Sequence, residues 1–130
     1  MPNRLAERIE LLRGELIRNP VIASFRFLQV YIAEGVAFYR VRATLSNSDM
    51  LQLVERFEYD AQELSISKYS YHWQRQNGSL ICRWDNAPHH PEISTFPHHI
   101  HDSDETNVLP HESIDVFMVI HLIEERIYRA

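Results

Sequence analysis

Apolar residues near the N-terminus repeat at the spacing of a helix. They are Leu5, Ile9, Leu12 and Leu16. Because this spacing places them on one side of a helix, the pattern predicts an amphipathic helix from Arg4 to Arg18. Asn3 is suited to cap its beginning, and Asn19-Pro20 to end it.

Two segments rich in β-branched and aromatic residues follow, and the turn Glu34-Gly35 separates them. They run over Val21–Ala33 and Val36–Leu45 and predict a β-hairpin. A two-residue loop pairs Leu28 with Val41 and Val30 with Tyr39. The predicted core face then contains Leu28, Val30, Ile32, Ala37, Tyr39 and Val41. The predicted opposite face contains Phe27, Gln29, Tyr31, Phe38, Arg40 and Arg42.

The segment Met50–Tyr59 fits either a helix capped by Asp49 or a third strand. We favour the strand because apolar residues alternate along it, with Glu55 as the exception. These residues are Leu51, Leu53, Phe57 and Tyr59.

A second hairpin is predicted around Asn77-Gly78, which joins Ile66–Gln76 to Ser79–Asp85. A two-residue turn pairs Trp73 with Cys82 and Tyr71 with Trp84. One face then contains Tyr69, Tyr71, Trp73, Leu80, Cys82 and Trp84. The other face presents Ser70, His72, Arg83 and Asp85, with Ile81 as an apolar exception.

Several prolines predict that the chain from Asn86 to Pro110 is a loop. A last helix is expected from Ser113 to Tyr128, since its apolar residues share one face. They are Val116, Val119, Ile120, Ile123 and Ile127. The sequence therefore predicts one α+β domain over residues 1–130, an antiparallel meander of four to five strands packed with an N-terminal and a C-terminal helix.

Composition and charge limit the classes of function that this domain can have. The 130 residues are 45% hydrophobic, and 13 basic against 18 acidic residues give a net charge of −5. This charge argues against nucleic-acid binding over the whole surface but leaves room for a local basic site. All basic residues except Lys68 are arginines, which suit phosphate. The single cysteine, Cys82, excludes an internal disulfide. No signal peptide or membrane-length apolar segment is recognisable, so a cytoplasmic protein without membrane contact is expected.

The segment from Asp85 to His101 holds five of the eight histidines, and it is the predicted working surface. Imidazoles titrate near neutral pH, and RNA supplies its own 2′-hydroxyl nucleophile. This favours a metal-independent ribonuclease, in which Arg83 faces the phosphate and Asp85 orients a histidine. The candidate catalytic residues are His98, His99, His101, His72, Arg83 and Asp85. The candidate substrate-binding residues are Arg40, Arg42, His89 and His90.

Other interpretations of the histidines stay open. His99 with His101, or His89 with His98, could bind zinc together with Asp85 or Glu92. The spacing matches no common zinc motif, so the expected cofactor is none, with zinc as the alternative. Histidines can also simply bond loop carbonyls, as we expect for His111 and His121. Without catalysis, the loop would belong to an interaction module.

Long and unusual motifs in this region resemble the TumE family, the toxin half of prokaryotic toxin–antitoxin pairs. They are Tyr69-Ser70-Tyr71-His72-Trp73-Gln74, the Asn77-Gly78 turn, the block from Asp85 to Glu92, and the block from Thr95 to His101. The resemblance extends from about Arg40 to Tyr128, and Met50–Glu63 is its least typical part. It implies a small cytoplasmic toxin of the type II class, neutralised by an antitoxin with a helix-turn-helix DNA-binding domain. It assigns no catalytic residue, and it leaves a homodimer open.

Overall fold

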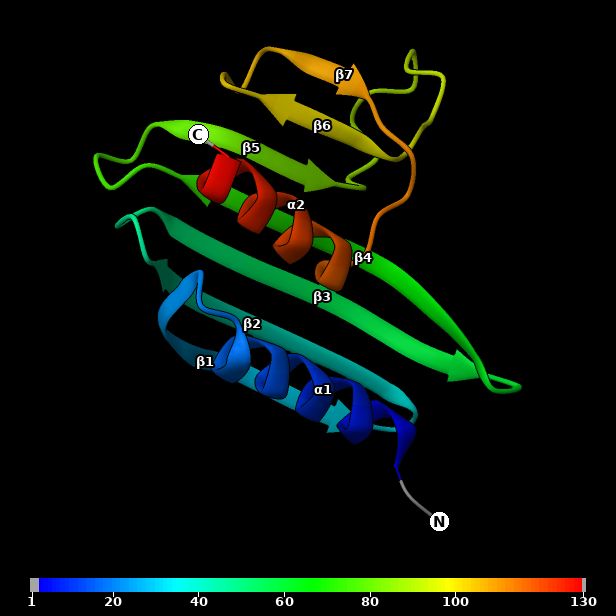
Figure 1. Cartoon of the computed structure of the whole chain (residues 1–130). Helices are drawn as coiled ribbons and strands as arrows, with labels where there is room; N and C mark the ends of the chain where they lie inside the picture. Colours follow the sequence, from blue (N-terminus) through cyan, green and yellow to red (C-terminus); the bar gives the residue numbers. More distant parts are fainter. Residues whose placement is uncertain (1–2, 130) are drawn as a thin grey trace.

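The computed structural model describes residues 3–129, which form two helices and seven strands (Figure 1). The helices are α1 (Arg4–Arg18) and α2 (Val116–Arg129). The strands are β1 (Ile22–Ala33), β2 (Val36–Leu45), β3 (Met50–Asp60), β4 (Glu63–Gln74), β5 (Leu80–Asp85), β6 (His99–Asp102) and β7 (Val108–Pro110). The strands form one antiparallel sheet in chain order. The predicted α+β class is confirmed, with more strands than the four to five expected.

The two additional strands lie in the segment that the sequence predicted as loop, from Asn86 to Pro110. The prolines border these strands rather than break them. Pro97 precedes β6, and Pro110 ends the edge strand β7, where a missing N–H group is tolerated. The prediction of a continuous loop was therefore wrong, because it missed the strand that contains His99 and His101.

Helix α1 has the predicted bounds and cap. The side-chain oxygen of Asn3 accepts a hydrogen bond from the backbone N–H of Leu5 at 3.0 Å. The four predicted apolar residues are all buried. Such a cap satisfies backbone donors that the first helical turn leaves unpaired.

The first hairpin has the predicted register near its turn, where Val30 pairs with Tyr39. A bulge at Leu28 changes the register beyond it, so that Phe27 rather than Leu28 pairs with Val41. Phe27 consequently packs against the core, contrary to the prediction. The predicted core residues Leu28, Val30 and Ile32 are exposed, because β1 is an edge strand that the helices do not fully cover.

Strand β3 confirms the favoured interpretation of the Met50 segment. Leu51, Leu53 and Phe57 are buried, and the exception, Glu55, is buried with them. The guanidinium of Arg8 on α1 pairs with the Glu55 carboxylate at 2.8 Å. A buried carboxylate is tolerable in a core only with such compensation.

The second hairpin has the predicted central pairs, Trp73 with Cys82 and Tyr71 with Trp84. Its loop differs, because the hydrogen bond from the Arg75 N–H to the Ser79 carbonyl encloses three residues instead of two. A bulge at Ile81 restores the register. Ile81 is therefore buried in the core instead of lying on the opposite face as predicted.

Both helices cover the same face of the sheet (Figure 1), and the core lies between them and the strands. Side chains alternate between the two faces of a strand, so the residues between the buried ones point away from the helices. We call this second surface the open face. None of the described helices has the length and apolarity needed to span a membrane.

Candidate functional site

Pairing of β5 with β6 assembles the central residues of the site on the open face. Arg83 is paired with His101, and Asp85 with His99. On the other side of β5, His72 is paired with Arg83. The alternation of His99 and His101 along β6 places both imidazoles on the same face as Asp85.

The Asp85 carboxylate lies at the centre of this group. One oxygen is 2.9 Å from Nε2 of His99, and the other is 3.4 Å from Nε2 of His101. The second oxygen also accepts a hydrogen bond from Nε of Arg83 at 3.1 Å. Asp85 thus contacts both imidazoles and the guanidinium. The role predicted for it, to orient a histidine, stays a prediction.

The two imidazoles are held in fixed orientations. Nδ1 of His99 lies 2.9 Å from the carbonyl oxygen of Pro97, and Nδ1 of His101 lies 2.9 Å from that of Glu105. Because a carbonyl can only accept, each Nδ1 carries the hydrogen. The Nε2 atoms then face each other at 3.1 Å. The two side chains are only 3% and 8% exposed.

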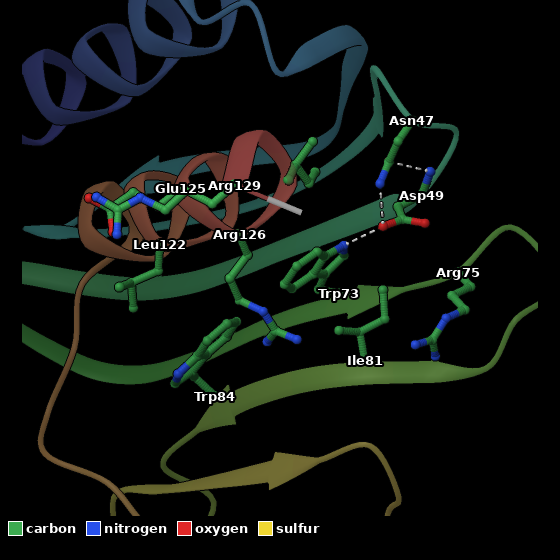
Figure 2. Close-up of a pocket in the computed structure, with 11 residues that line it drawn as sticks. Asn47, Asp49, Trp73, Arg75, Ile81, Trp84, Leu122, Glu125, Arg126 and Arg129 are labelled. Atoms are coloured by element: carbon green, nitrogen blue, oxygen red, sulfur yellow. Dashed lines mark hydrogen bonds between the residues drawn. The ribbon is translucent and has the colours of Figure 1, made fainter.

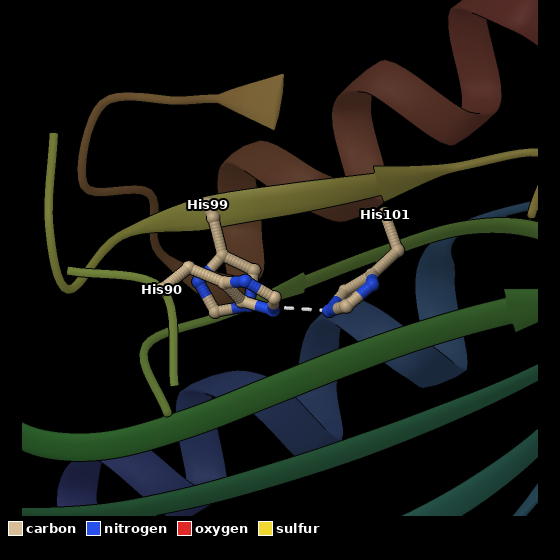
Figure 3. A group of neighbouring side chains, drawn as sticks. All are labelled: His90, His99 and His101. Atoms are coloured by element: carbon tan, nitrogen blue, oxygen red, sulfur yellow. Dashed lines mark hydrogen bonds between the residues drawn. The ribbon is translucent and has the colours of Figure 1, made fainter. Parts of the chain in front are cut away.

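The segment between β5 and β6 brings a third imidazole to this pair. The His90 ring lies with its centre 5.2 Å from that of His99 and 6.1 Å from that of His101. Figure 3 shows the three rings converging, with the dashed line joining His99 and His101. One ring nitrogen from each of the three lies within 4.8 Å of the others. We call His90, His99, His101 and Asp85 the histidine cluster.

Arg83 is bound by two acidic residues. Besides Asp85, it contacts the Glu105 carboxylate through two nitrogens, each at 2.6 Å. These hydrogen bonds to Glu105 raise the pKa of Arg83 despite its partial burial, and the same contact lowers the pKa of Glu105. A carboxylate occupies the planar fork that would otherwise suit a phosphate. Glu105 was not predicted, since nothing in the local sequence distinguishes it from a solvated loop acid.

The remaining predicted histidines lie outside the cluster. The His98 ring stacks on Tyr69, and its Nδ1 is 2.8 Å from the Tyr69 hydroxyl. Burial and then the negative charge of Asp85 raise the pKa of Tyr69 to about 12, so this hydroxyl stays protonated and can donate. His72 bonds Gln74, and His89 is exposed. Of the two leading catalytic candidates, His98 and His99, the structure brings only His99 next to Asp85 and Arg83.

Arginines extend from the cluster across the open face. One continuous row of paired positions runs from β1 to β6 through Arg26, Arg42, Gln52, His72, Arg83 and His101. The neighbouring row contains Arg40, Val54, Ser70, Asp85 and His99. Arg56 and Lys68 pair next to these rows. Six of the 13 basic residues therefore share this face, including the predicted substrate-binding residues Arg40 and Arg42.

A larger pocket lies on the helix side of the sheet, away from the histidine cluster. Its volume is about 930 Å³, and α2 and the β4–β5 hairpin line it (Figure 2). The guanidinium of Arg126 lies 4.9 Å from the centre of a Trp73 ring and bonds Cys82. Size alone would favour this pocket as a binding site, and two core tryptophans, aliphatic side chains and several charged residues line it. Within residues 3–129, however, the group of three close imidazole nitrogens lies in the histidine cluster and not in this pocket. We therefore place the candidate chemistry on the open face.

Comparison with known proteins gives one match. A model of the family described as "Toxin TumE" matches residues 12–129, which is most of the chain. No curated protein and no solved structure matches it. The matched range contains every residue of the histidine cluster and both arginine rows.

Proposed function

The chain belongs to the TumE family, whose members are toxins of toxin–antitoxin systems, and we propose that it acts by binding and cleaving RNA on the open face of its sheet. The observation behind this proposal is the basic row that leads to the histidine cluster. RNA binding by proteins rests largely on contacts between cations and phosphates, and it needs a local basic surface rather than a basic protein.

The arrangement separates binding from chemistry. Adjacent strands lie about 4.8 Å apart, so Arg42 on β2 is roughly 14 Å from Arg83 on β5. Phosphates held by Arg42 and Arg40 would guide a single strand toward Arg83 and the cluster. The exposed Tyr31 and half-buried Phe38 on the same face offer rings for base stacking.

Arg83 is the proposed electrophilic group at the scissile phosphate. Its fork would have to exchange the Glu105 carboxylate for the phosphate, and Glu105 is on an exposed loop between β6 and β7. Arginine suits this role because its planar donors match phosphate oxygens in a bidentate manner. The acid–base roles predicted for His98, His99, His101 and His72 stay predictions. So does the metal-independent form of the reaction.

The experiment is an RNA integrity assay with purified, untagged protein that is toxic in cells. We expect cleavage of single-stranded RNA, and weaker binding by the double variant Arg40→Gln with Arg42→Gln. Each lost phosphate contact lowers the salt slope by about 0.7 for a single strand, so the double variant should lose about 1.4. Arg18→Gln on the helix side is the control, since it also removes an exposed arginine, like Arg42, but from α1 rather than from the open face.

Intact RNA from folded and toxic protein, with no RNA binding, would overturn the proposal. An interaction module that inhibits another target would then be the better account. Equal salt slopes for the double variant and the Arg18→Gln control would show that RNA binds elsewhere on the molecule.

The family implies an antitoxin partner in general. We propose in addition that this antitoxin is a protein, as in type II systems, and that it has a helix-turn-helix DNA-binding domain, as the sequence resemblance implies. A cytoplasmic site of action fits an RNA substrate. Co-expression followed by size-exclusion chromatography with light scattering would test the complex, and would also establish whether the toxin alone is a homodimer.

A further inference from the structure

The histidine cluster directs several hydrogen-bond acceptors at one point. The Nδ1 hydrogens of His99 and His101 bond backbone carbonyls, so in neutral rings both Nε2 atoms are lone-pair acceptors. They lie 3.1 Å from each other and 2.9 and 3.4 Å from the oxygens of Asp85. Acceptors repel one another, so a positively charged species must lie among them.

A proton serves this purpose poorly. One proton on Nε2 of His99 can point either to His101 or to Asp85, and the other acceptor then still faces a lone pair. Two protons could each point to one Asp85 oxygen, but they place two positively charged rings with their Nε2 atoms only 3.1 Å apart, and one carboxylate offsets only one of the two charges. Burial makes this more costly, since charges in a protein interior are weakly screened.

A metal cation satisfies all the acceptors at once. Ligands 2.0–2.1 Å from a tetrahedral zinc ion are separated by about 3.3 Å from each other. The distances between the Nε2 atoms and the Asp85 oxygens bracket this value. The bonds from Nδ1 to carbonyl oxygens are also the usual support of metal-bound histidines, because they fix the ring orientation and tautomer.

We propose that the cluster binds one transition-metal ion of the zinc class, through Nε2 of His99 and His101, a ring nitrogen of His90 and an oxygen of Asp85. Three imidazoles favour zinc and its neighbours over magnesium or calcium, which prefer oxygen ligands. His90 completes the shell from the loop, with its nitrogen within 4.8 Å of the other two. The site is distinct from known helical zinc motifs because its core is a His-x-His pair on a strand.

This inference deepens the proposed function, since the ion would lie beside Arg83, where we place the scissile phosphate. Metal binding itself does not require RNA cleavage, and the two can fail separately. An ion at this position would make the reaction metal-dependent, in contrast to the metal-independent chemistry expected from the sequence.

The test measures zinc binding directly, with protein purified without a histidine tag and stripped by a chelator. We expect one zinc ion per chain by calorimetry and by elemental analysis, and a higher melting temperature of the loaded protein. Cobalt in place of zinc should give the visible absorption typical of tetrahedral coordination.

His90→Ala is the informative variant, because His90 is half-buried on a loop and its loss spares the sheet. It should weaken zinc binding at least tenfold and remove the cobalt signal. His89→Ala is the matched control, since it removes the adjacent, exposed histidine. His101→Gln, checked for folding by circular dichroism, should also lose binding.

Absence of stoichiometric binding in the wild type would overturn the proposal, and so would equal weakening by His89→Ala and His90→Ala. A protein that binds one zinc ion but leaves RNA intact would retain the metal site and refute the RNA proposal. A stripped protein that binds no zinc yet cleaves RNA would do the opposite.

Discussion

Replacing Arg8 with methionine leaves the Glu55 carboxylate in the core without the guanidinium that neutralises it. Glu55 is 0% exposed, and Arg8 contacts both of its oxygens, at 2.8 and 3.3 Å. The Tyr71 hydroxyl donates a further hydrogen bond of 2.6 Å. Burial, followed by the charge of Glu55, raises the pKa of Tyr71 well above its usual value, so this donor stays protonated.

The cost of breaking this pair follows from its burial. Removing one partner of a buried ion pair destabilises a protein by about 3–5 kcal/mol. Unfolding entropy near 2.1 cal/mol/K per residue gives about 270 cal/mol/K for 130 residues. Arg8→Met should therefore lower the melting temperature by about 11–18 °C.

The double variant Arg8→Met with Glu55→Leu separates the charge from the packing. It removes both charges and leaves apolar side chains of similar length, and such replacements are often neutral or stabilising. Methionine also preserves packing beside Phe57 and Phe117, whose ring centres lie 5.4 Å from the Arg8 guanidinium. We expect the double variant to regain only part of the stability that Arg8→Met loses, because the buried Tyr71 hydroxyl then lacks its acceptor, at a cost of about 1–3 kcal/mol.

Thermal and urea unfolding followed by circular dichroism would measure these differences. Arg18→Met is the control on the same helix, since the pair of Arg18 with Glu15 is exposed and should be worth less than about 1 kcal/mol. The reasoning fails if Arg8→Met is no less stable than this control. It also fails if the double variant is as unstable as the single one.

Three further predictions concern other parts of the chain. Glu105→Gln should free the Arg83 guanidinium and raise the affinity for RNA up to about fivefold, which corresponds to the free energy of an exposed ion pair of up to about 1 kcal/mol. Unchanged affinity in fluorescence anisotropy would contradict competition between Glu105 and RNA for Arg83. Burial raises the pKa of Cys82 despite the contact with Arg126, so a thiol reagent should react more than about tenfold faster in denaturant than with folded protein; similar rates would be inconsistent with a buried thiol. Leu53→Ala removes a fully buried core side chain and should cost about 2–5 kcal/mol in chemical unfolding, whereas Leu11→Ala on the exposed side of α1 should cost far less.

Local patterns predicted most of the elements, because their signals lie within a few residues. Helical spacing identified α1 and α2. The Asn77-Gly78 turn located the second hairpin, and the predicted pairing of Arg83 with His72 is right because the bulge at Ile81 offsets the extra residue in the loop. The bulges at Leu28 and Ile81 could not be predicted. They depend on how the edge strand and the hairpin loop fit the helices, which is a property of the packed structure.

The candidate site was predictable by composition but not by geometry. Clustering of histidines indicated the segment, and the hairpin register placed Arg83 and Asp85 on one face. A long loop separates β5 from β6 and fixes no register, so the sequence could not show that Asp85 pairs with His99. For the same reason it ranked His98 beside His99, although the strand directs only His99 and His101 toward Asp85.

The proposed function also requires that a chain with a net charge of −5 present a local basic surface to RNA. Its basic residues are not spread evenly, since six of the 13 lie on the open face, at paired positions of neighbouring strands. Arg40 and Arg42 are on β2, three strands from Arg83 on β5. We therefore expect their replacement to change the affinity for RNA and its salt dependence. The chemistry at the cluster should remain intact in their absence, and saturating RNA should restore the cleavage rate of the double variant.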